Sequence, residues 1–373
     1  MPVPLAIVAA EAGVSVATVS KVLNSRSDIS EATRARVSAV LAAHGHEVRP
    51  RRPRETGLFD VRIVNLEGAW AEAVVLGAAA AAKRHGKDLV LTVDPDADDC
   101  DGWVRHALSR GTDGLLSIVA VPTASGREAL AREGVPFVAV DPLHATPPGT
   151  LVIASTNYQG AFDATRHLLE LGHRRIATIT GPVEQDNALA RLAGYQAALL
   201  QAGLPDDADL IIRARYGITD GYESTKKLLQ LDERPTAIFA ASDDTAIGAI
   251  RAIREAGLHV PDDLSVIGFD DVPYARWTDP PLSTIRQPLK RMGNAAVEML
   301  ARARDGRVDV GRTELATTLV ARTSTGPGPA AARRGANAAR IRPETPTSDV
   351  ISRPPDREPF MASTPGDEPR RKA

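Results

Sequence analysis

A short polar set lies near the beginning of the chain, at the predicted start of a helix. Ser15 stands where a helix N-cap belongs, and apolar residues follow it at helical spacing as far as Leu23. Hydroxyl, amide and ammonium groups there can bind phosphates, and the first turns of such a helix can contact base edges in a major groove. The candidate DNA contacts are Leu5, Ser15, Val16, Ala17, Thr18, Ser20, Lys21, Asn24 and Thr33.

A second polar set follows predicted buried strands. Asp270 comes directly after the apolar run 266–269, and Ser242 and Asp243 follow the run 238–241. A carboxylate beside a guanidinium can bind adjacent sugar hydroxyls through charge-assisted hydrogen bonds, and an aromatic side chain can stack on a sugar ring. The candidate contacts of a small effector are Trp70, Gln159, Arg191, Tyr216, Ser242, Asp243 and Asp270.

Some of these residues have plainer alternative roles. Val16 could belong to a small helical core, and Thr18 and Ser20 could be ordinary solvent-facing polar residues. Asp243 has a helix N-capping role as an equal alternative. Trp277, another aromatic candidate for stacking, suits interface or core packing somewhat better.

The elements that would position the first set form a helix-turn-helix. Leu5, Val8, Ala9 and Ala12 fall at i, i+3, i+4 and i+7, on one face of a helix that Gly13 ends in a positive-φ conformation. A third helix is predicted from Ser30, its cap, to about residue 43. Small and apolar residues at these offsets favour a helix-turn-helix over a plain helical hairpin.

The elements that would position the second set alternate between strands and amphipathic helices. Repeated units of this kind predict parallel sheets covered on both faces, in two similar subdomains that join near residues 155–157, with a ligand cleft beyond the carboxyl ends of the strands. The predicted strands are 61–66, 88–93, 114–119, 137–140, 175–180, 236–241 and 264–269. The predicted helices are 72–85, 103–110, 127–133, 158–171, 188–202, 222–231 and 246–256.

Composition limits the classes of function. The 373 residues carry a net charge of −2, yet the segment up to residue 54 holds eight basic and four acidic residues, as a DNA-facing module on a near-neutral body would. The single cysteine, Cys100, excludes a disulfide framework and a cysteine-based zinc cluster. No apolar run is long enough to span a membrane, and the amino terminus does not read as a secretory signal, so we expect a cytoplasmic protein without a membrane partner.

Several motifs resemble the lac repressor family (LacI/GalR type). In the headpiece these are residues 12–15 (AGVS), 17–20 (ATVS), 22–24 (VLN) and 29–34 (ISEATR). In the body they are residues 157–160 (NYQG), 191–195 (RLAGY), 239–243 (FAASD), 266–271 (VIGFDD), 280–288 (PPLSTIRQP) and 319–325 (LVARTST). The chain departs from the family at Pro4 and Ile7, which occupy the places of a cap and a first-turn acid, and at Ser242, where the family often has Asn.

The resemblance implies a type I periplasmic-binding-protein-like body with two parallel-sheet subdomains, between which the chain crosses three times. We place the crossings near Ser155, at 282–287 and at 308–315. Arg191, Ser242 and Asp270 match family positions that contact the effector, and Gln159 and Tyr216 fall at two further lining positions. Family members bind near-palindromic operators as homodimers, so the same is expected here.

We therefore predict a sequence-specific transcriptional regulator, of the repressor kind, controlled by a small effector of the sugar class. The predicted domains are a helix-turn-helix headpiece (1–44), an Arg/Pro-rich linker (45–59), an effector-binding and dimerisation body (60–325) and a disordered tail (326–373). A stand-alone sugar-binding receptor with a vestigial headpiece is the main alternative. An enzyme is disfavoured because GxGxxG, P-loop, GxSxG and HExxH motifs are absent, and the histidines lack metal-ligand spacing. No cofactor and no metal are expected.

The linker departs most from the family, whose members usually form a hinge helix here that inserts a leucine into the minor groove. Pro50 and Pro53 disfavour a helix, and no Ala-x-x-Leu pattern is present. We predict no hinge helix and no leucine wedge; instead, Arg51 and Arg52 contact a narrow minor groove, which concentrates negative potential. A solvated linker that only adds nonspecific charge is the alternative.

Replacing both arginines tests this prediction. The Arg51→Ala/Arg52→Ala protein should show a shallower salt dependence of operator binding, by about one unit of slope per arginine, and should lose any preference for A/T-rich operator centres. Fluorescence anisotropy across a salt series measures the slope. An unchanged slope, or strong operator bending by the wild-type protein, would contradict the prediction.

Overall fold

The structure is a computed structural model that describes residues 3–23, 29–46, 55–64, 66, 68–94, 99–307 and 311–329. Three predictions therefore lie outside the described residues: the DNA contact of Asn24, the linker contacts of Arg51 and Arg52, and disorder of the tail from residue 330 onward.

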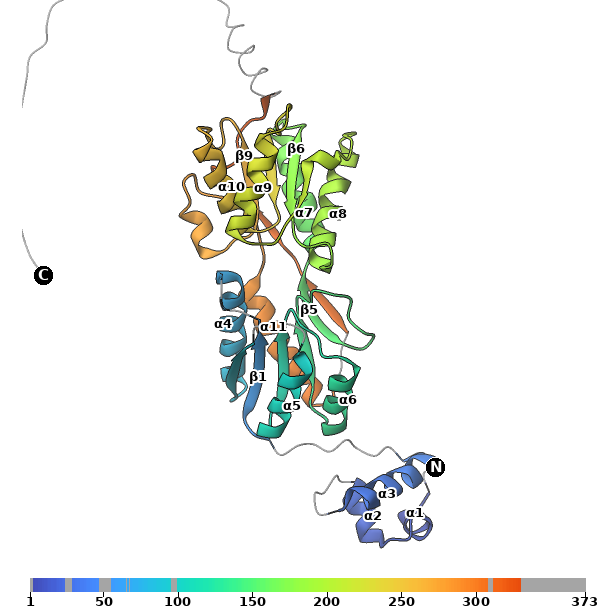
Figure 1. Cartoon of the computed structure of the whole chain (residues 1–373). Helices are drawn as coiled ribbons and strands as arrows, with labels where there is room; N and C mark the ends of the chain where they lie inside the picture. Colours follow the sequence, from blue (N-terminus) through green and yellow to red (C-terminus); the bar gives the residue numbers. More distant parts are fainter. Residues whose placement is uncertain are drawn as a thin grey trace, which may run out of the picture. The chain divides into compact units, whose positions relative to one another are not determined.

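The amino-terminal helices form a small domain with its own core. They are α1 (Leu5–Glu11), α2 (Val16–Leu23) and α3 (Glu31–Ala43), and the chain bends by 106° between α1 and α2 (Figure 1). As predicted, Gly13 has a φ of +62°, and the Ser15 hydroxyl accepts a hydrogen bond from the Thr18 N–H. Helix α1 has no side-chain cap and no acidic residue in its first turn, as Pro4 and Ile7 suggest. The core side chains are Val8, Ala9, Ala12, Val19, Val22, Val37 and Leu41.

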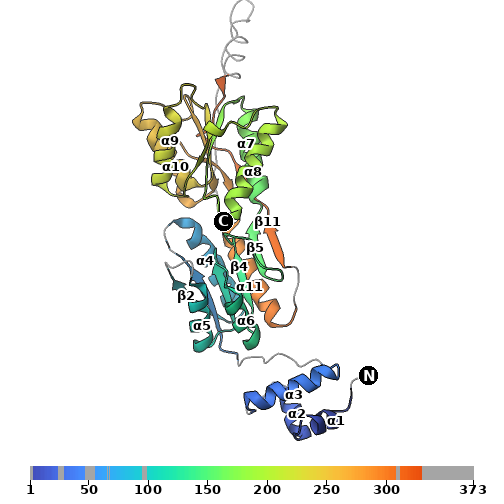
Figure 2. The ribbon, with the colours of Figure 1, turned by 45° about the vertical axis from the view of Figure 1, so that its right-hand side comes forward.

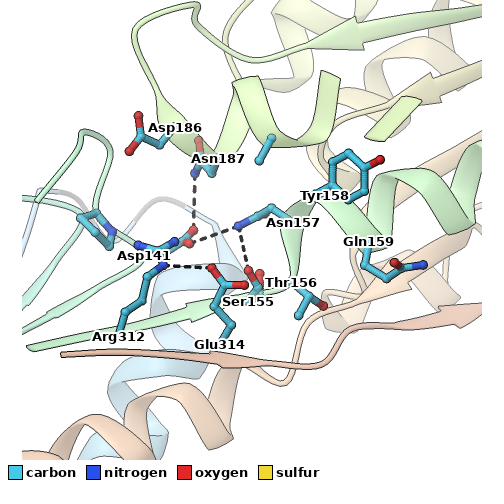
Figure 3. A pocket seen from close by; sticks show the side chains of 12 residues that line it. Asp141, Ser155, Thr156, Asn157, Tyr158, Gln159, Asp186, Asn187, Arg312 and Glu314 are labelled. Atoms are coloured by element: carbon cyan, nitrogen blue, oxygen red, sulfur yellow. Dashed lines mark hydrogen bonds and ion pairs between the residues drawn. The ribbon is translucent and has the colours of Figure 1, made fainter. Parts of the chain in front are cut away.

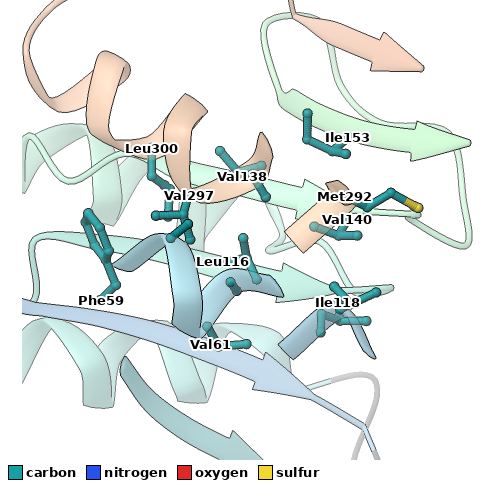
Figure 4. Close-up of a cluster of buried hydrophobic side chains, with 14 of the residues drawn as sticks. Phe59, Val61, Leu116, Ile118, Val138, Val140, Ile153, Met292, Val297 and Leu300 are labelled. Carbon is teal, nitrogen blue, oxygen red and sulfur yellow. The ribbon is translucent and has the colours of Figure 1, made fainter. Parts of the chain in front are cut away.

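The body contains two six-stranded sheets, and the first is entirely parallel with the strand order β11-β5-β4-β3-β1-β2. Helices α4 (Ala69–Arg84) and α11 (Leu289–Arg304) cover one face, over the apolar core in Figure 4, and α5 (Cys100–Arg110) and α6 (Ala124–Glu133) pack on the other. The strands are β1 (Leu58–Ile63), β2 (Asp88–Val93), β3 (Gly114–Ile118), β4 (Phe137–Val140), β5 (Leu151–Ser155) and β11 (Arg312–Leu315).

The second sheet has the order β12-β10-β9-β8-β6-β7, in which only the edge strand β12 is antiparallel. Helices α7 (Asn157–Glu170) and α8 (Asp186–Gln201) pack on one face, and α9 (Ile218–Leu229) and α10 (Asp243–Glu255) on the other (Figure 2). The strands are β6 (Ile176–Thr180), β7 (Ile211–Arg213), β8 (Ala237–Ala240), β9 (Ser265–Asp270), β10 (Ser283–Arg286) and β12 (Thr318–Val320). Two 3₁₀ turns, η1 (Ala208–Leu210) and η2 (Pro273–Arg276), complete the body.

The two sheets have corresponding strand orders, which the predicted pair of similar subdomains requires. Counted from the edge strand β2, β4 is the fourth strand of the first sheet. Counted from the edge strand β7, β9 is the fourth strand of the second sheet. The residue after β4 is Asp141, and the last residue of β9 is Asp270. Both have positive φ, of 47° and 123°. Strained non-glycine backbone of this kind collects at functional sites.

The chain crosses between the sheets three times. The first crossing follows Ser155, as predicted, and the second lies at Gln287–Pro288, between β10 and α11. The third prediction, 308–315, is wrong in place, because residues 312–315 pair with β5 in the first sheet. The chain crosses after them, at Ala316–Thr317, where it enters β12.

The first strand also differs from its prediction, since β1 begins at Leu58 rather than at residue 61. Asp60 and Arg62 interrupt the apolar run, but both are fully buried and ion-paired, Asp60 with Arg110 and Arg62 with Asp94. Strands β5, β7, β10, β11 and β12 and helix α11 were not among the predicted elements.

One buried carboxylate ties the start of the body to its core. Asp113 is fully buried, and its oxygens accept hydrogen bonds from the Thr56 and Gly57 N–H groups at 2.9 and 3.0 Å. Lys87 and Arg304 pair with it, both at 2.7 Å. These donors hold the pKa of Asp113 below its usual value against the opposing effect of burial. Asp113 therefore fixes the point at which the chain enters β1 from the linker.

Replacing Asp113 with Asn should lower the free energy of unfolding by about 3–5 kcal/mol, because it removes the counter-charge of Arg304 and one of the two carboxylates that pair with the buried Lys87. Urea denaturation of the full chain measures the loss. The exposed carboxylate of Asp232 provides the control: Asp232→Asn should change stability by less than about 0.5 kcal/mol. Equal effects of the two substitutions would refute the anchoring role of Asp113.

Candidate functional site

The start of α2 presents most of the predicted DNA contacts on the surface of the headpiece. Val16 is 47% exposed, which rules out its alternative role as core, and Ala17 and Lys21 are also exposed. Ser15 is exposed although its hydroxyl caps the helix through Thr18. These groups share one exposed helix start, which is the part of a helix-turn-helix that can enter a major groove.

The other predicted DNA contacts are less exposed. Thr18, Ser20, Thr33 and Leu5 are half-buried, and Leu5 packs against the headpiece core. The Thr33 hydroxyl accepts a hydrogen bond from Ser30, whose own hydroxyl accepts from the Thr33 N–H as the cap of α3. Thr33 therefore stands at the amino-terminal end of α3, where a phosphate could meet free N–H groups.

In the body, Arg191 forms the centre of the second set. Its side chain is 4% exposed, and its guanidinium lies 3.8 Å from the centroid of the Phe269 ring and 5.5 Å from that of Tyr216. It donates hydrogen bonds to the Asn157 side-chain oxygen, at 2.8 Å, and to the Ala241 carbonyl. Its charge therefore serves to hold together residues from several elements of the second subdomain.

Two buried aspartates face this guanidinium from the two subdomains. Asp270 lies 3.9 Å from Arg191 and accepts a 2.6 Å hydrogen bond from Gln287. Asp141 has only two long contacts, 3.5 Å from the Asn157 amide and 3.4 Å from the Asn187 amide. Burial raises the pKa of both carboxyls, that of Asp270 to about 7, although the positive charge of Arg191 opposes the shift.

Tyr216 and Ser242 lie beside Arg191 but have partners within the protein. The Tyr216 hydroxyl donates to the Asn187 side-chain oxygen at 3.1 Å, and burial raises its pKa to about 12. The Ser242 hydroxyl accepts from the Thr245 N–H as the cap of α10 and lies 3.1 Å from the Tyr216 carbonyl, to which it can donate. The N-cap of α10 is therefore Ser242, and the alternative role proposed for Asp243 as this cap does not apply.

Asp243 does not reach the cleft, and its predicted effector contact needs correction. Its side chain is fully buried within the second subdomain, where one oxygen accepts from the Val272 N–H and the other from the Thr284 hydroxyl. With both oxygens bonded and no exposure, Asp243 joins α10 to β10 and the loop after β9. Position after a strand does not distinguish an inward from an outward carboxylate.

The remaining predicted residues lie at the edges of the cleft. Trp70, on α4, packs against the apolar cores of both subdomains. Gln159 is exposed and donates to Asp163 at 3.1 Å. Trp277 is 81% exposed, so core packing within this chain, one of its two plainer roles, does not apply.

A cavity of about 220 Å³ opens between the subdomains next to Arg191 (Figure 3). Pockets for small molecules run from roughly 300 Å³ upward, so this cavity suits a ligand of modest size. Ten of the twelve residues that line it have polar or charged side chains, and Gln159 is the only one of the twelve from the predicted effector set. The lining residues are Asp141, Pro142, Ser155, Thr156, Asn157, Tyr158, Gln159, Asp186, Asn187, Ala190, Arg312 and Glu314.

Sequence reasoning missed the most polar of these residues. Asp141 follows β4 as Asp270 ends β9, so the rule that selected Asp270 could have selected Asp141 as well. Asn157 and Asn187 lie in the first turns of α7 and α8, where a polar residue is easily interpreted as part of a helix start. Arg312 and Glu314 lie on β11, a strand that was not predicted.

A network of hydrogen bonds connects Asp270 with the three crossings. Gln287, at the second crossing, donates to Asp270 and accepts from the Ser155 hydroxyl at 2.7 Å. Thr156, at the first crossing, accepts a 3.0 Å bond from the Thr317 N–H at the third. Asp270 is thus one hydrogen bond away from the second crossing and two from the first.

The described residues contain no cluster of three or more His, Cys, Asp or Glu side chains that could hold a metal ion. They also contain no single helix of the length and apolarity needed to cross a membrane; α1 and α2 pass that test only when taken together as a bent pair.

Comparisons with known proteins agree with both parts of the chain. Residues 5–47 match the family described as bacterial regulatory proteins, lacI family, and residues 165–325 match a periplasmic binding protein-like domain. The HTH-type transcriptional regulator MalR of Streptomyces coelicolor is 36% identical over 312 residues, which cover 80% of this chain and 90% of MalR. Catabolite control protein A of Priestia megaterium is 30% identical over 302 residues, 79% of this chain and 90% of that protein.

Solved structures give the same result. The complex of the transcriptional regulator CelR with cellobiose has a TM-score of 0.67 at 30% identity, covering 86% of this chain and 99% of that one. The lac repressor dimer bound to operator and the anti-inducer ONPF has a TM-score of 0.66 at 29% identity, covering 87% and 100%.

The raised pKa of Asp270 predicts a dependence of stability on pH. Between about pH 4 and pH 7 the folded protein holds a proton on Asp270 that the unfolded chain has released, so the free energy of unfolding falls as the pH rises through this window. The change is up to about 4 kcal/mol. Asp270→Asn should make the pH dependence of stability shallower, because an amide does not titrate. Part of the dependence should remain, because burial also raises the pKa values of Asp141 and Asp243.

Urea denaturation at several pH values measures this dependence, with Asp232→Asn as the control that retains it. A wild-type slope in Asp270→Asn would show that Asp270 is ionised throughout this pH range.

Proposed function

This chain belongs to the lacI family of bacterial regulatory proteins and is a DNA-binding transcriptional regulator with an effector-binding body; we propose that it is a repressor whose effector is a sugar held between the two subdomains. The observation that carries the sugar assignment is the pair Asp141 and Asp270. They come from corresponding strand ends of the two sheets; Asp270 lies 3.9 Å from Arg191, and the same positive charge acts on Asp141, which lines the cavity. A ring that bears hydroxyls on both faces can donate to both carboxylates.

Relatives and similar structures support the same ligand class. One structure contains cellobiose, and another, of a LacI family regulator from Enterococcus faecium with 26% identity and a TM-score of 0.66, contains ribose. We assign the effector contacts to Asp141, Asn187, Arg191 and Asp270, with Tyr216 beside them. Ser242 and Trp70 act from the edge, through capping and packing.

On the DNA side, we propose that two copies of the chain bind a near-palindromic operator. A single helix-turn-helix covers few base pairs, and the lac repressor structure is of a dimer on its operator. Val16 and Ala17 would meet thymine methyl groups, and Lys21 a guanine edge. We propose a headpiece up to residue 44, a linker that ends before β1 at Leu58, a body, and a tail; the body extends past residue 325, because the Gly326 and Gly328 N–H groups bond to the Ser265 hydroxyl and the Leu171 carbonyl. Binding of the effector with different affinities to two states of the body would control DNA affinity.

Three substitutions separate the two sites. Lys21→Ala should relax sequence preference at one symmetric position of each half-site and leave effector binding unchanged. Arg191→Ala and Asp270→Ala should abolish the effector response and leave operator binding in place, because each leaves buried partners unpaired at a cost of about 1–3 kcal/mol or more.

Operator binding by mobility shift, and effector binding by calorimetry with the full chain, measure both effects. If Lys21→Ala weakens binding equally on every DNA sequence, Lys21 contacts a phosphate instead of a base. An effector dissociation constant that is unchanged in both body variants would refute the assignment of the cleft.

A further inference from the structure

The charge of the cleft narrows the ligand class beyond a sugar. Three of the residues that line the cavity are carboxylates, Asp141, Asp186 and Glu314, and one, Arg312, is a guanidinium. Arg312 donates to Glu314 at 2.9 Å, so its charge is already paired (Figure 3). The adjacent guanidinium, Arg191, is also committed, to Asp270, Asn157 and the Ala241 carbonyl. The one guanidinium that lines the described cavity therefore has its counter-charge within the same lining.

The amino-terminal ends of two helices favour an anionic ligand, but each carries less charge than a carboxylate. Helices α7 and α8 both begin at the cavity, at Asn157 and Asp186, and a helix start carries about half a positive charge. Asp186 stands in the first turn of α8 and offsets that helix start with a full negative charge. With Asp141 ionised, the three carboxylates outweigh Arg312 and the two helix starts, so the balance of the lining is negative.

One group in this lining needs hydrogen-bond donors. Asp141 is 3% exposed, and each of its oxygens receives a single amide contact, at 3.4 or 3.5 Å. A buried carboxylate usually accepts several bonds near 2.8 Å. Because it faces an open cavity, hydroxyl or ammonium groups of a ligand can supply the missing bonds, whereas a phosphate or carboxylate cannot.

From these observations we propose that the effector is an uncharged sugar or an amino sugar, of about monosaccharide size in this cavity, and that Asp141 and Glu314 exclude phosphorylated sugars and sugar acids. The proposal rests on the assignment of the cleft to a sugar. It makes Asp141 the main acceptor of ligand hydroxyls and Glu314 a residue that determines specificity through charge.

Matched sets of sugars test the proposal on the full chain. Each set contains a neutral monosaccharide, its 2-amino form, its 6-phosphate and its uronic acid; glucose, galactose, mannose and ribose, with the derivatives that exist for each, provide the parent compounds. Thermal shift identifies the set that binds, and calorimetry gives the dissociation constants. We expect the neutral or amino member of that set to bind at least about tenfold more tightly than the phosphate and the uronic acid.

Two variants attribute the selectivity to residues. Glu314 is 45% exposed, so Glu314→Gln should fold normally, and it should narrow the gap between the neutral sugar and its phosphate by about tenfold. Asp141→Asn should weaken the neutral sugar instead. The exposed Glu128, on α6, provides the control: Glu128→Gln should leave both dissociation constants unchanged.

The outcomes are distinct. Binding of a phosphate or uronic acid as tightly as its neutral parent would overturn this proposal and leave the sugar assignment in place. Binding of no member of any set, by a protein that still binds operator DNA, would overturn the sugar assignment and this proposal together. An unchanged gap in Glu314→Gln would remove Glu314 from the account of specificity.

Discussion

The body depends on burial of one positive charge, that of Arg191. A guanidinium that leaves water must regain its hydrogen bonds and its counter-charge inside the protein. Arg191 obtains its hydrogen bonds from Asn157 and the Ala241 carbonyl, and the ring of Phe269 lies 3.8 Å away. Its counter-charge is Asp270, 3.9 Å away, and because burial raises the pKa of Asp270 to about 7, the ion pair is complete only above that pH. These partners come from α7, the loop after β8 and the end of β9, so satisfying a single side chain fixes the edge of the second sheet against the first crossing.

The same network connects the proposed effector contacts to the three crossings. Gln287 bonds both to Asp270 and to Ser155, and the neighbouring Thr156 bonds to Thr317. A ligand that bonds to Asp270 competes with or reinforces the bond from Gln287, which belongs to the second crossing. Opening of the subdomains must change these same bonds, because all three crossings take part in them. Differential affinity of the effector for the two arrangements is what regulation requires.

The sequence predicted those features that local patterns control. The helix-turn-helix followed from apolar spacing, from Gly13 and from the Ser15 cap, all of which act within a few residues. Arg191 and Asp270 followed from motif and from position after a strand. The approach of Asp141 to Arg191 depends on how the first subdomain closes on the second, and no local pattern encodes that closure. Asp243 was misplaced for a related reason, since only the packing of α10 decides that its carboxylate turns inward.

Regulation also needs a path from the crossings to the point where the chain enters the body. Asp113 fixes that point: it binds the N–H groups of Thr56 and Gly57 and is itself held by Lys87 and Arg304. Arg304 belongs to α11, which directly follows the second crossing. Because α11 is one continuous helix from Leu289 to Arg304, a shift at the crossing is passed along it to Asp113 and so to the residues that precede β1.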